Sequence, residues 1–166
     1  MLTQTLTAVG YTSLAHFSFF EVRENTSTQQ KSLHSNRLFE PGEMLSAFSA
    51  KEIFREPSYL TVQTAMHTHI TLFPEYLQYI NHSCSPNVFF DTNTMQLVCI
   101  KKIEPEDELT FFYPSTEWKM AQPFHCLCGA ENCLHEIQGA YYLPDDILNQ
   151  YRLTSFIQQQ MQSRHQ

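Results

Sequence analysis

Three cysteines stand within eight positions in the segment FHCLCGAENCLH at 124–135. Cys126, Cys128 and Cys133 follow the spacing C-x-C-x4-C, and Gly129 allows the backbone to turn tightly after the second of them. Thiolates at this spacing can surround one tetrahedral zinc ion, which in structural sites almost always has four ligands. The alternative is a set of small buried hydrophobic side chains, because free cysteine is often buried. We favour the metal site, which then needs a fourth ligand from elsewhere in the chain.

Two other cysteines could supply the fourth ligand, Cys84 and Cys99. Cys99 stands in the strand-like run MQLVCIKKI, where a core thiol is the simpler interpretation. Cys84 stands in NHSCSPN, where polar residues and Pro86 indicate a turn. We therefore predict Cys84 as the fourth ligand. His125 and His135 flank the cluster and are possible substitutes that we expect to face solvent.

The bulk properties indicate one domain in a reducing compartment. The chain has 166 residues, of which 42% are hydrophobic and 16% charged, enough for a buried core. A formal net charge of −7 disfavours direct nucleic-acid binding, including a zinc-ribbon contact to DNA, and favours a basic partner. Five cysteines, four of them assigned to metal, fit an intracellular location better than a disulfide framework. Residues 1–17 lack the features of a secretory signal, and no stretch approaches the ~18 apolar residues of a membrane span.

Short strands dominate the predicted secondary structure. The polar run 23–36 predicts a loop or an irregular hairpin. FPEYLQYI at 73–80 predicts a short helical turn, and 144–162 predicts one amphipathic helix. Aromatic and β-branched runs predict strands within 17–22, 38–48, 59–66, 95–103 and 108–113.

Three motifs in this order resemble the SET-domain protein-lysine methyltransferases that carry a zinc-binding post-SET segment. The resemblance covers residues from about 30 to 143 and assigns the fourth zinc thiolate to Cys84. It implies a mainly β fold with short helices: the β-clip-like SET fold with a pseudoknot, a zinc-bound post-SET segment and a C-terminal α-helix. The motifs are NHSCSPN (81–87), ELTFFY (108–113) and FHCLCGAENC (124–133). The implied parts are a SET domain over 1–120, a post-SET zinc segment over 121–143 and a helix over 144–166 packed on the same domain.

The resemblance also implies S-adenosyl-L-methionine as methyl donor and the lysine side chain of a basic protein or peptide as acceptor. Asn81, His82 and Phe124 would line the cofactor pocket, with Asn81 at the amino-acid end and His82 meeting the adenine largely through its backbone. Tyr113 matches the catalytic tyrosine and would also contact the cofactor. Phe111 stands at the position that tunes how many methyl groups are added, and phenylalanine there favours a di- or trimethylated product.

The aromatic run FFYPSTEW suits this chemistry. A lysine ammonium with an unperturbed pKa of about 10.4 must lose its proton before it can accept a methyl group. Desolvation in an aromatic channel lowers that pKa, and aromatic faces attract cations without a fixed counter-charge. The sequence therefore predicts a narrow aromatic channel that ends at Tyr113.

The chain departs from the family pattern near the expected cofactor loop. The family has glycines where this chain has Gln30, Lys31 and Ser32, and glycine there lets the backbone approach the cofactor closely. Glu106 and His135 also replace glycines that are common in the family. The alternative is therefore a catalytically degenerate SET module that acts as a zinc-stabilised protein-binding domain. The retained motif residues favour the enzyme.

Overall fold

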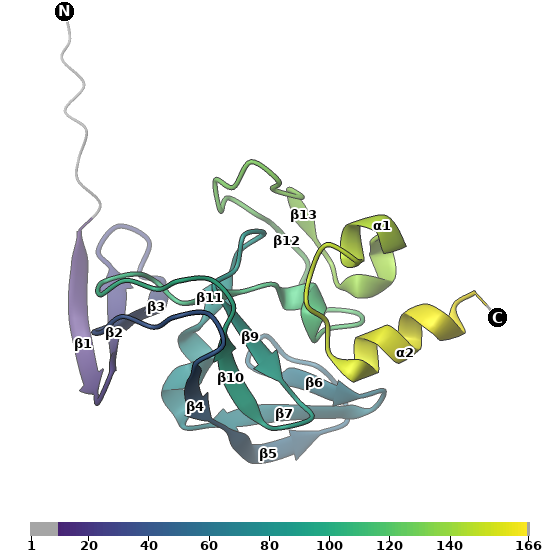
Figure 1. Cartoon of the computed structure of the whole chain (residues 1–166), viewed down its shortest axis with the longest axis horizontal. Coiled ribbons are helices and arrows are strands. Elements are labelled where there is room, and N and C mark those ends of the chain that lie inside the picture. The colour runs from purple at the N-terminus through teal and green to yellow at the C-terminus, as the bar shows by residue number, and fades with distance from the viewer. Residues whose placement is uncertain (1–9, 166) are drawn as a thin grey trace, which may run out of the picture.

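The computed structural model of the chain describes residues 10–165 and consists mainly of short β-strands in five small sheets (Figure 1). Short helices follow in the C-terminal part. The predicted mainly β fold with short helices is confirmed. Part of the segment on which the signal-peptide prediction was based, residues 1–9, lies outside the described residues, as does residue 166. Among the described residues no helix is long and apolar enough to cross a membrane.

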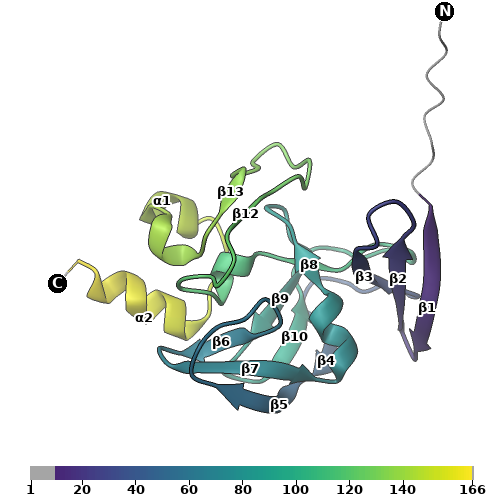
Figure 2. The same cartoon turned by 180° about the vertical axis from the view of Figure 1, so that it is seen from behind.

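The N-terminal sheet lies at one end of the molecule (Figures 1 and 2). The predicted strand at 17–22 is wrong as a single element, because a turn with Ser18 at φ 34° separates the first two strands of this sheet. The predicted loop or hairpin at 23–36 is a hairpin, in which Asn25 Oδ1 accepts hydrogen bonds from the amides of the turn. The antiparallel order is β1 (Tyr11–Phe17), β2 (Phe20–Asn25) and β3 (Lys31–Ser35).

Two three-stranded antiparallel sheets enclose the main core. The first has the order β4 (Met44–Ala47), β10 (Gln96–Cys99), β9 (Val88–Asp91). The second has the order β5 (Ser49–Phe54), β7 (Thr68–Phe73), β6 (Val62–Ala65). The predicted helical turn is the 3₁₀ helix η1 (Glu75–Tyr79). Fully buried side chains between these elements include Phe39, Phe90, Leu97, Ile103 and Leu109.

The segment 107–111 threads between two parts of the chain that are far apart in sequence. On one side, the amide of Leu109 donates to the carbonyl of Leu33 over 2.8 Å. On the other side, β11 (Thr110–Phe111) pairs in parallel with β8 (Asn81–His82). This threading is the arrangement that a pseudoknot requires, and it brings NHSCSPN beside ELTFFY.

The C-terminal part packs on the rest of the chain through a second core. Here the prediction of one helix over 144–162 is wrong, because Thr154 ends the preceding turn. Its amide donates to Ser115 O over 3.0 Å, and its hydroxyl caps the next helix at the amide of Ile157. Phe112 and Trp118 share this core with buried residues of the helical region. The elements are η2 (Tyr113–Ser115), β12 (Phe124–His125), β13 (Glu136–Ile137), η3 (Ala140–Tyr142), α1 (Asp145–Leu148) and α2 (Ser155–Ser163). The division at 120 and 143 stays a prediction.

Candidate active site and thiol cluster

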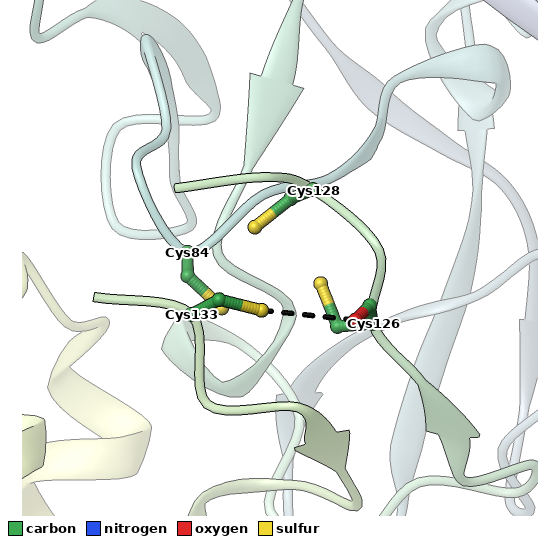
Figure 3. A group of neighbouring side chains, drawn as sticks. All are labelled: Cys84, Cys126, Cys128 and Cys133. Atoms are coloured by element: carbon green, nitrogen blue, oxygen red, sulfur yellow. Dashed lines mark hydrogen bonds between the residues drawn. The ribbon is translucent and has the colours of Figure 1, made fainter. Parts of the chain in front are cut away.

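Four cysteine side chains converge on one point (Figure 3). The sulfur atoms of Cys84, Cys126, Cys128 and Cys133 all lie within 4.8 Å of one another. In a tetrahedral site with zinc–sulfur bonds of roughly 2.3 Å, sulfur atoms stand about 3.8 Å apart, so only small shifts separate this cluster from that geometry. The structure thus brings Cys84 to the three distal cysteines, and their role as zinc ligands stays a prediction.

Local hydrogen bonds explain how the loop of the distal cysteines reaches Cys84. Gly129 has φ +71°, a conformation that favours glycine, and turns the chain between the second and third cysteines. The amide of Leu134 donates to Cys84 Sγ over 3.4 Å. Asn132 Nδ2 and the Tyr151 hydroxyl both donate to the carbonyl of Cys84, each over 2.9 Å. The loop is therefore docked on residue 84 by polar contacts as well as by the thiols.

The thiols of the cluster differ in how readily they ionise. Burial raises the pKa of Cys84 and raises that of Cys126 to about 11. For Cys128 burial also opposes ionisation, but hydrogen bonds, first that from the Ala130 amide, lower its pKa to about 6. Buried thiolates need a compensating positive charge, which a divalent metal ion supplies. The donor set, four sulfurs from two buried and two partly exposed cysteines, suits zinc.

The other candidates are not members of the cluster. Cys99 is buried in the main core, and its Sγ donates to Lys101 O over 3.0 Å, as expected for a core thiol. His125 and His135 stack on each other with ring centroids 6.0 Å apart. Among residues 10–165, these four cysteines are the one cluster of three or more side chains that could bind a metal ion.

One cavity of about 680 Å³ lies beside the cluster. Its volume falls in the range of about 300–1,000 Å³ that is typical of ligand pockets. Cys126 and Cys128 contribute to its wall, as do Gln30 and Ser32 from the region without the family glycines. The predicted site residues that line it are Asn81, His82, Phe111, Tyr113 and Phe124. All predicted cofactor-binding and catalytic residues thus meet in one place, and their individual roles stay predictions.

Tyr113 lies at the centre of an aromatic group. Its ring centroid is 4.7 Å from that of Phe111, 5.2 Å from that of His82 and 5.9 Å from that of Phe124. Burial raises the pKa of Tyr113 to about 12, and the negative charges of two nearby glutamates act in the same direction. The phenol therefore keeps its proton at neutral pH and can donate a hydrogen bond into the cavity.

The imidazole of His82 connects Tyr113 with the thiol cluster. Its Nδ1 accepts a hydrogen bond from the Tyr113 amide over 3.2 Å, so the proton of the neutral ring is on Nε2. Nε2 lies 3.4 Å from Cys84 Sγ and can donate to it. Burial lowers the pKa of His82 to about 4, which keeps the ring neutral. The sequence suggested a backbone role for His82 and gave no sign of this side-chain bridge.

The side chain of Asn81 is held by two acceptors. Its Nδ2 donates to Lys31 O over 2.9 Å and to Glu108 Oε1 over 3.0 Å. Because Nδ2 is used in this way, the amide oxygen Oδ1 is left to accept from a ligand. Glu108 also lines the cavity, and sequence reasoning missed it.

A second glutamate, Glu117, was also missed. It is buried, with 7% of its surface exposed, and it lines the same cavity. Its Oε1 accepts from the Gln63 amide over 2.8 Å and from the Thr116 hydroxyl over 3.1 Å. Burial raises the pKa of Glu117 to about 7. The signal available in the sequence was one acidic residue within the aromatic run FFYPSTEW.

The fold and this site define a known class of protein. The family model described as "SET domain" matches residues 12–114, so the chain belongs to the SET-domain family. The chain is similar to "Methyltransferase flvH" of Aspergillus flavus, with 45% identity over 103 residues, which are 60% of this chain and 57% of that protein. The chain therefore spans little more than half the length of this relative.

Proposed function

We propose that the chain catalyses methyl transfer from S-adenosyl-L-methionine to the lysine side chain of a protein. The observation that carries this proposal is that one cavity is lined by Asn81, His82, Phe111, Tyr113 and Phe124 together. Membership of the SET-domain family and similarity to a methyltransferase support the reaction class. A net charge of −7 and two carboxyl groups in the cavity support a basic peptide as acceptor.

The cavity suits the cofactor in size and in lining. When bound, S-adenosyl-L-methionine supplies a methyl group activated by its sulfonium. Asn81 would offer Oδ1 to the amino-acid end, while His82 and Phe124 would supply apolar and backbone contacts. Gln30 and Ser32 form part of the wall, so the segment that lacks the family glycines still borders the cavity.

The aromatic residues would prepare the acceptor amine. Burial among Phe111, Tyr113 and Phe124 strips water from the amine and lowers its pKa, so that its lone pair is available. The protonated hydroxyl of Tyr113 would orient the amine for an in-line approach. Phe111 has no hydroxyl to hold water or amine, which leaves room for a di- or trimethylated product.

The thiol cluster would hold a structural zinc ion. Cys126 and Cys128 belong both to the cluster and to the cavity wall, so the ion would fix the post-SET segment over the cavity.

All five cysteines are free thiols, which suits a reducing intracellular compartment, the cytoplasm or the nucleus.

A methyl-transfer screen with labelled cofactor tests the proposal. The substrates are lysine-bearing peptides and whole-cell lysate, and labelled proteins are hydrolysed to find methyl-lysine. We expect label on lysine with the wild-type chain and at least about 100-fold less with Tyr113→Phe. Label on another residue type would overturn the lysine assignment.

The alternative is a catalytically degenerate SET module that serves as a zinc-stabilised protein-binding domain. The absence of glycine at 30–32 favours it. Calorimetry with S-adenosyl-L-methionine separates the two functions. Heat of binding supports the enzyme, and no heat at high micromolar cofactor supports the binding module.

A further inference from the structure

The backbone of Tyr113 is tied to two different parts of the cavity wall. Its amide donates to His82, which lies on β8 next to Asn81. Its carbonyl accepts a hydrogen bond from the Glu117 amide over 3.0 Å. Glu117 in turn contacts Gln63 of β6, a strand that belongs to a different sheet from β8. The proposed cofactor residues and Glu117 therefore join Tyr113 from different elements.

The carboxyl of Glu117 is oriented before any ligand arrives. Gln63 holds it by a reciprocal pair of contacts: the Gln63 amide donates to Glu117 Oε1 over 2.8 Å, and Gln63 Oε1 accepts from the Trp118 amide over 2.9 Å. The Thr116 hydroxyl adds a second donor to Oε1. These contacts fix the side chain against β6 and leave its other oxygen for the cavity.

That other oxygen, Oε2, has no hydrogen-bond partner among residues 10–165. No lysine, arginine or histidine of the described chain pairs with this carboxyl, and its pKa is raised by burial without a counter-charge. An ionised carboxylate buried in this way costs free energy until a cation joins it. The cavity wall thus carries the oriented carboxyl group of Glu117, which has no cationic partner among the described residues, beside Tyr113 and its aromatic neighbours.

We propose that Glu117 is a substrate-binding residue whose carboxylate receives the cationic amine of the acceptor, and that it makes the cavity specific for lysine-like side chains. The inference rests on the proposed function, because it assumes that the acceptor enters beside Tyr113. The step is an ion pair, in which no covalent bond forms or breaks. The ion pair forms while the amine is still protonated, before methyl transfer requires its lone pair, and it adds charge recognition beside the aromatic group around Tyr113.

The first test measures binding without turnover. n-Butylammonium and n-butanol have similar apolar stems, and only the former carries a charge. Both are titrated into the full chain at pH 8 and followed by NMR. We expect the wild type to bind n-butylammonium more tightly than n-butanol, and Glu117→Gln to lose about tenfold or more of that affinity, as for a hydrogen bond to a charged group.

Glu52→Gln is the matched control, because Glu52 is exposed on β5 and outside the cavity. It should bind n-butylammonium as the wild type does. Glu117→Gln keeps the size of the side chain and an oxygen that can accept from Gln63, and a thermal melt checks that it is folded. Equal binding of the two probes by the wild type, or unchanged n-butylammonium binding by Glu117→Gln, overturns the proposal.

The second test separates binding from chemistry with a lysine peptide identified by the screen. Glu117→Gln should raise KM for the peptide by about tenfold or more, while the Kd for S-adenosyl-L-methionine stays unchanged. A fall in kcat at constant KM overturns the role in recognition. If the wild type transfers no methyl group at all, the proposed function fails, and the n-butylammonium comparison still decides the role of Glu117.

Discussion

The backbone amide of Tyr113 donates a hydrogen bond to Nδ1 of His82 across 3.2 Å, while Nε2 of the same ring faces Cys84 Sγ at 3.4 Å. One neutral imidazole therefore touches both the proposed catalytic turn and the thiol cluster. Removal of the proposed zinc ion should therefore change the surroundings of Tyr113 through this ring.

Tyr113→Phe should reduce methyl transfer by about 100-fold or more, because it removes a donor hydroxyl from the reacting centre. The fold and the zinc content should not change, since the Tyr113 hydroxyl is not needed for the backbone contact with His82. Steady-state rates with labelled cofactor measure the loss. Tyr142→Phe, at an exposed position, is the control. Wild-type turnover by Tyr113→Phe would remove the assigned role.

Cys84→Ser should lower the zinc content below one equivalent per chain and weaken cofactor binding, because Cys126 and Cys128 form part of the cavity wall. Metal analysis and calorimetry measure the two effects. Cys99→Ser should keep its zinc, since Cys99 is a core thiol whose contact with Lys101 O a serine hydroxyl can also make. Full zinc in Cys84→Ser would mean that another side chain is the fourth ligand.

The free energy of unfolding should fall as the pH rises from about 4.5 to 7, because Glu117 loses its proton in this range. Its pKa is raised by burial from 4.5 to about 7, so the folded state binds more protons than the unfolded state in this window. The contribution is fully present below pH 4.5 and is lost as pH rises through 7, with a size of about 3 kcal/mol. Urea unfolding at a series of pH values measures it. Glu117→Gln should lack this component, and a variant with the same pH slope as the wild type would contradict the assignment.

Thr154→Ala should lower the free energy of unfolding by about 1 kcal/mol, because it removes the N-cap of α2. For a chain of this length that corresponds to a fall in Tm of about 2–4 °C, which calorimetry can measure. Ser163→Ala, at an exposed position near the other end of α2, should change Tm less. An equal fall in both variants would mean that the cap does not determine where α2 begins.

Much of the site could be predicted because its parts are short motifs with distinct chemistry. NHSCSPN and ELTFFY are each contiguous, and the structure brings them together by pairing β8 with β11. Cys84 could be chosen over Cys99 because the local sequence differs: one is in a polar turn and the other in an apolar strand. In the folded chain both thiols are buried, but Cys84 lies in the thiol cluster and Cys99 in the main core.

The features that were missed depend on contacts between distant residues. The break at Thr154 relies on a hydrogen bond to Ser115, and no periodicity within 144–162 reveals it. The burial and orientation of Glu117 rely on Gln63, which is 54 positions earlier in the chain. An acidic residue read in isolation is expected at the surface. Only the assembled fold distinguishes it from an ordinary exposed glutamate.

The threaded segment 107–111 limits how the active site can change its width. Because this segment is hydrogen-bonded to Leu33 on one side and to β8 on the other, the floor of the site cannot spread without breaking backbone ladders at two places. Opening and closing are thus left to the stretch around 120–128, which is held by the pairing of β12 with β13 and by the thiol cluster. Access for a large protein substrate would therefore be governed from one side of the molecule only.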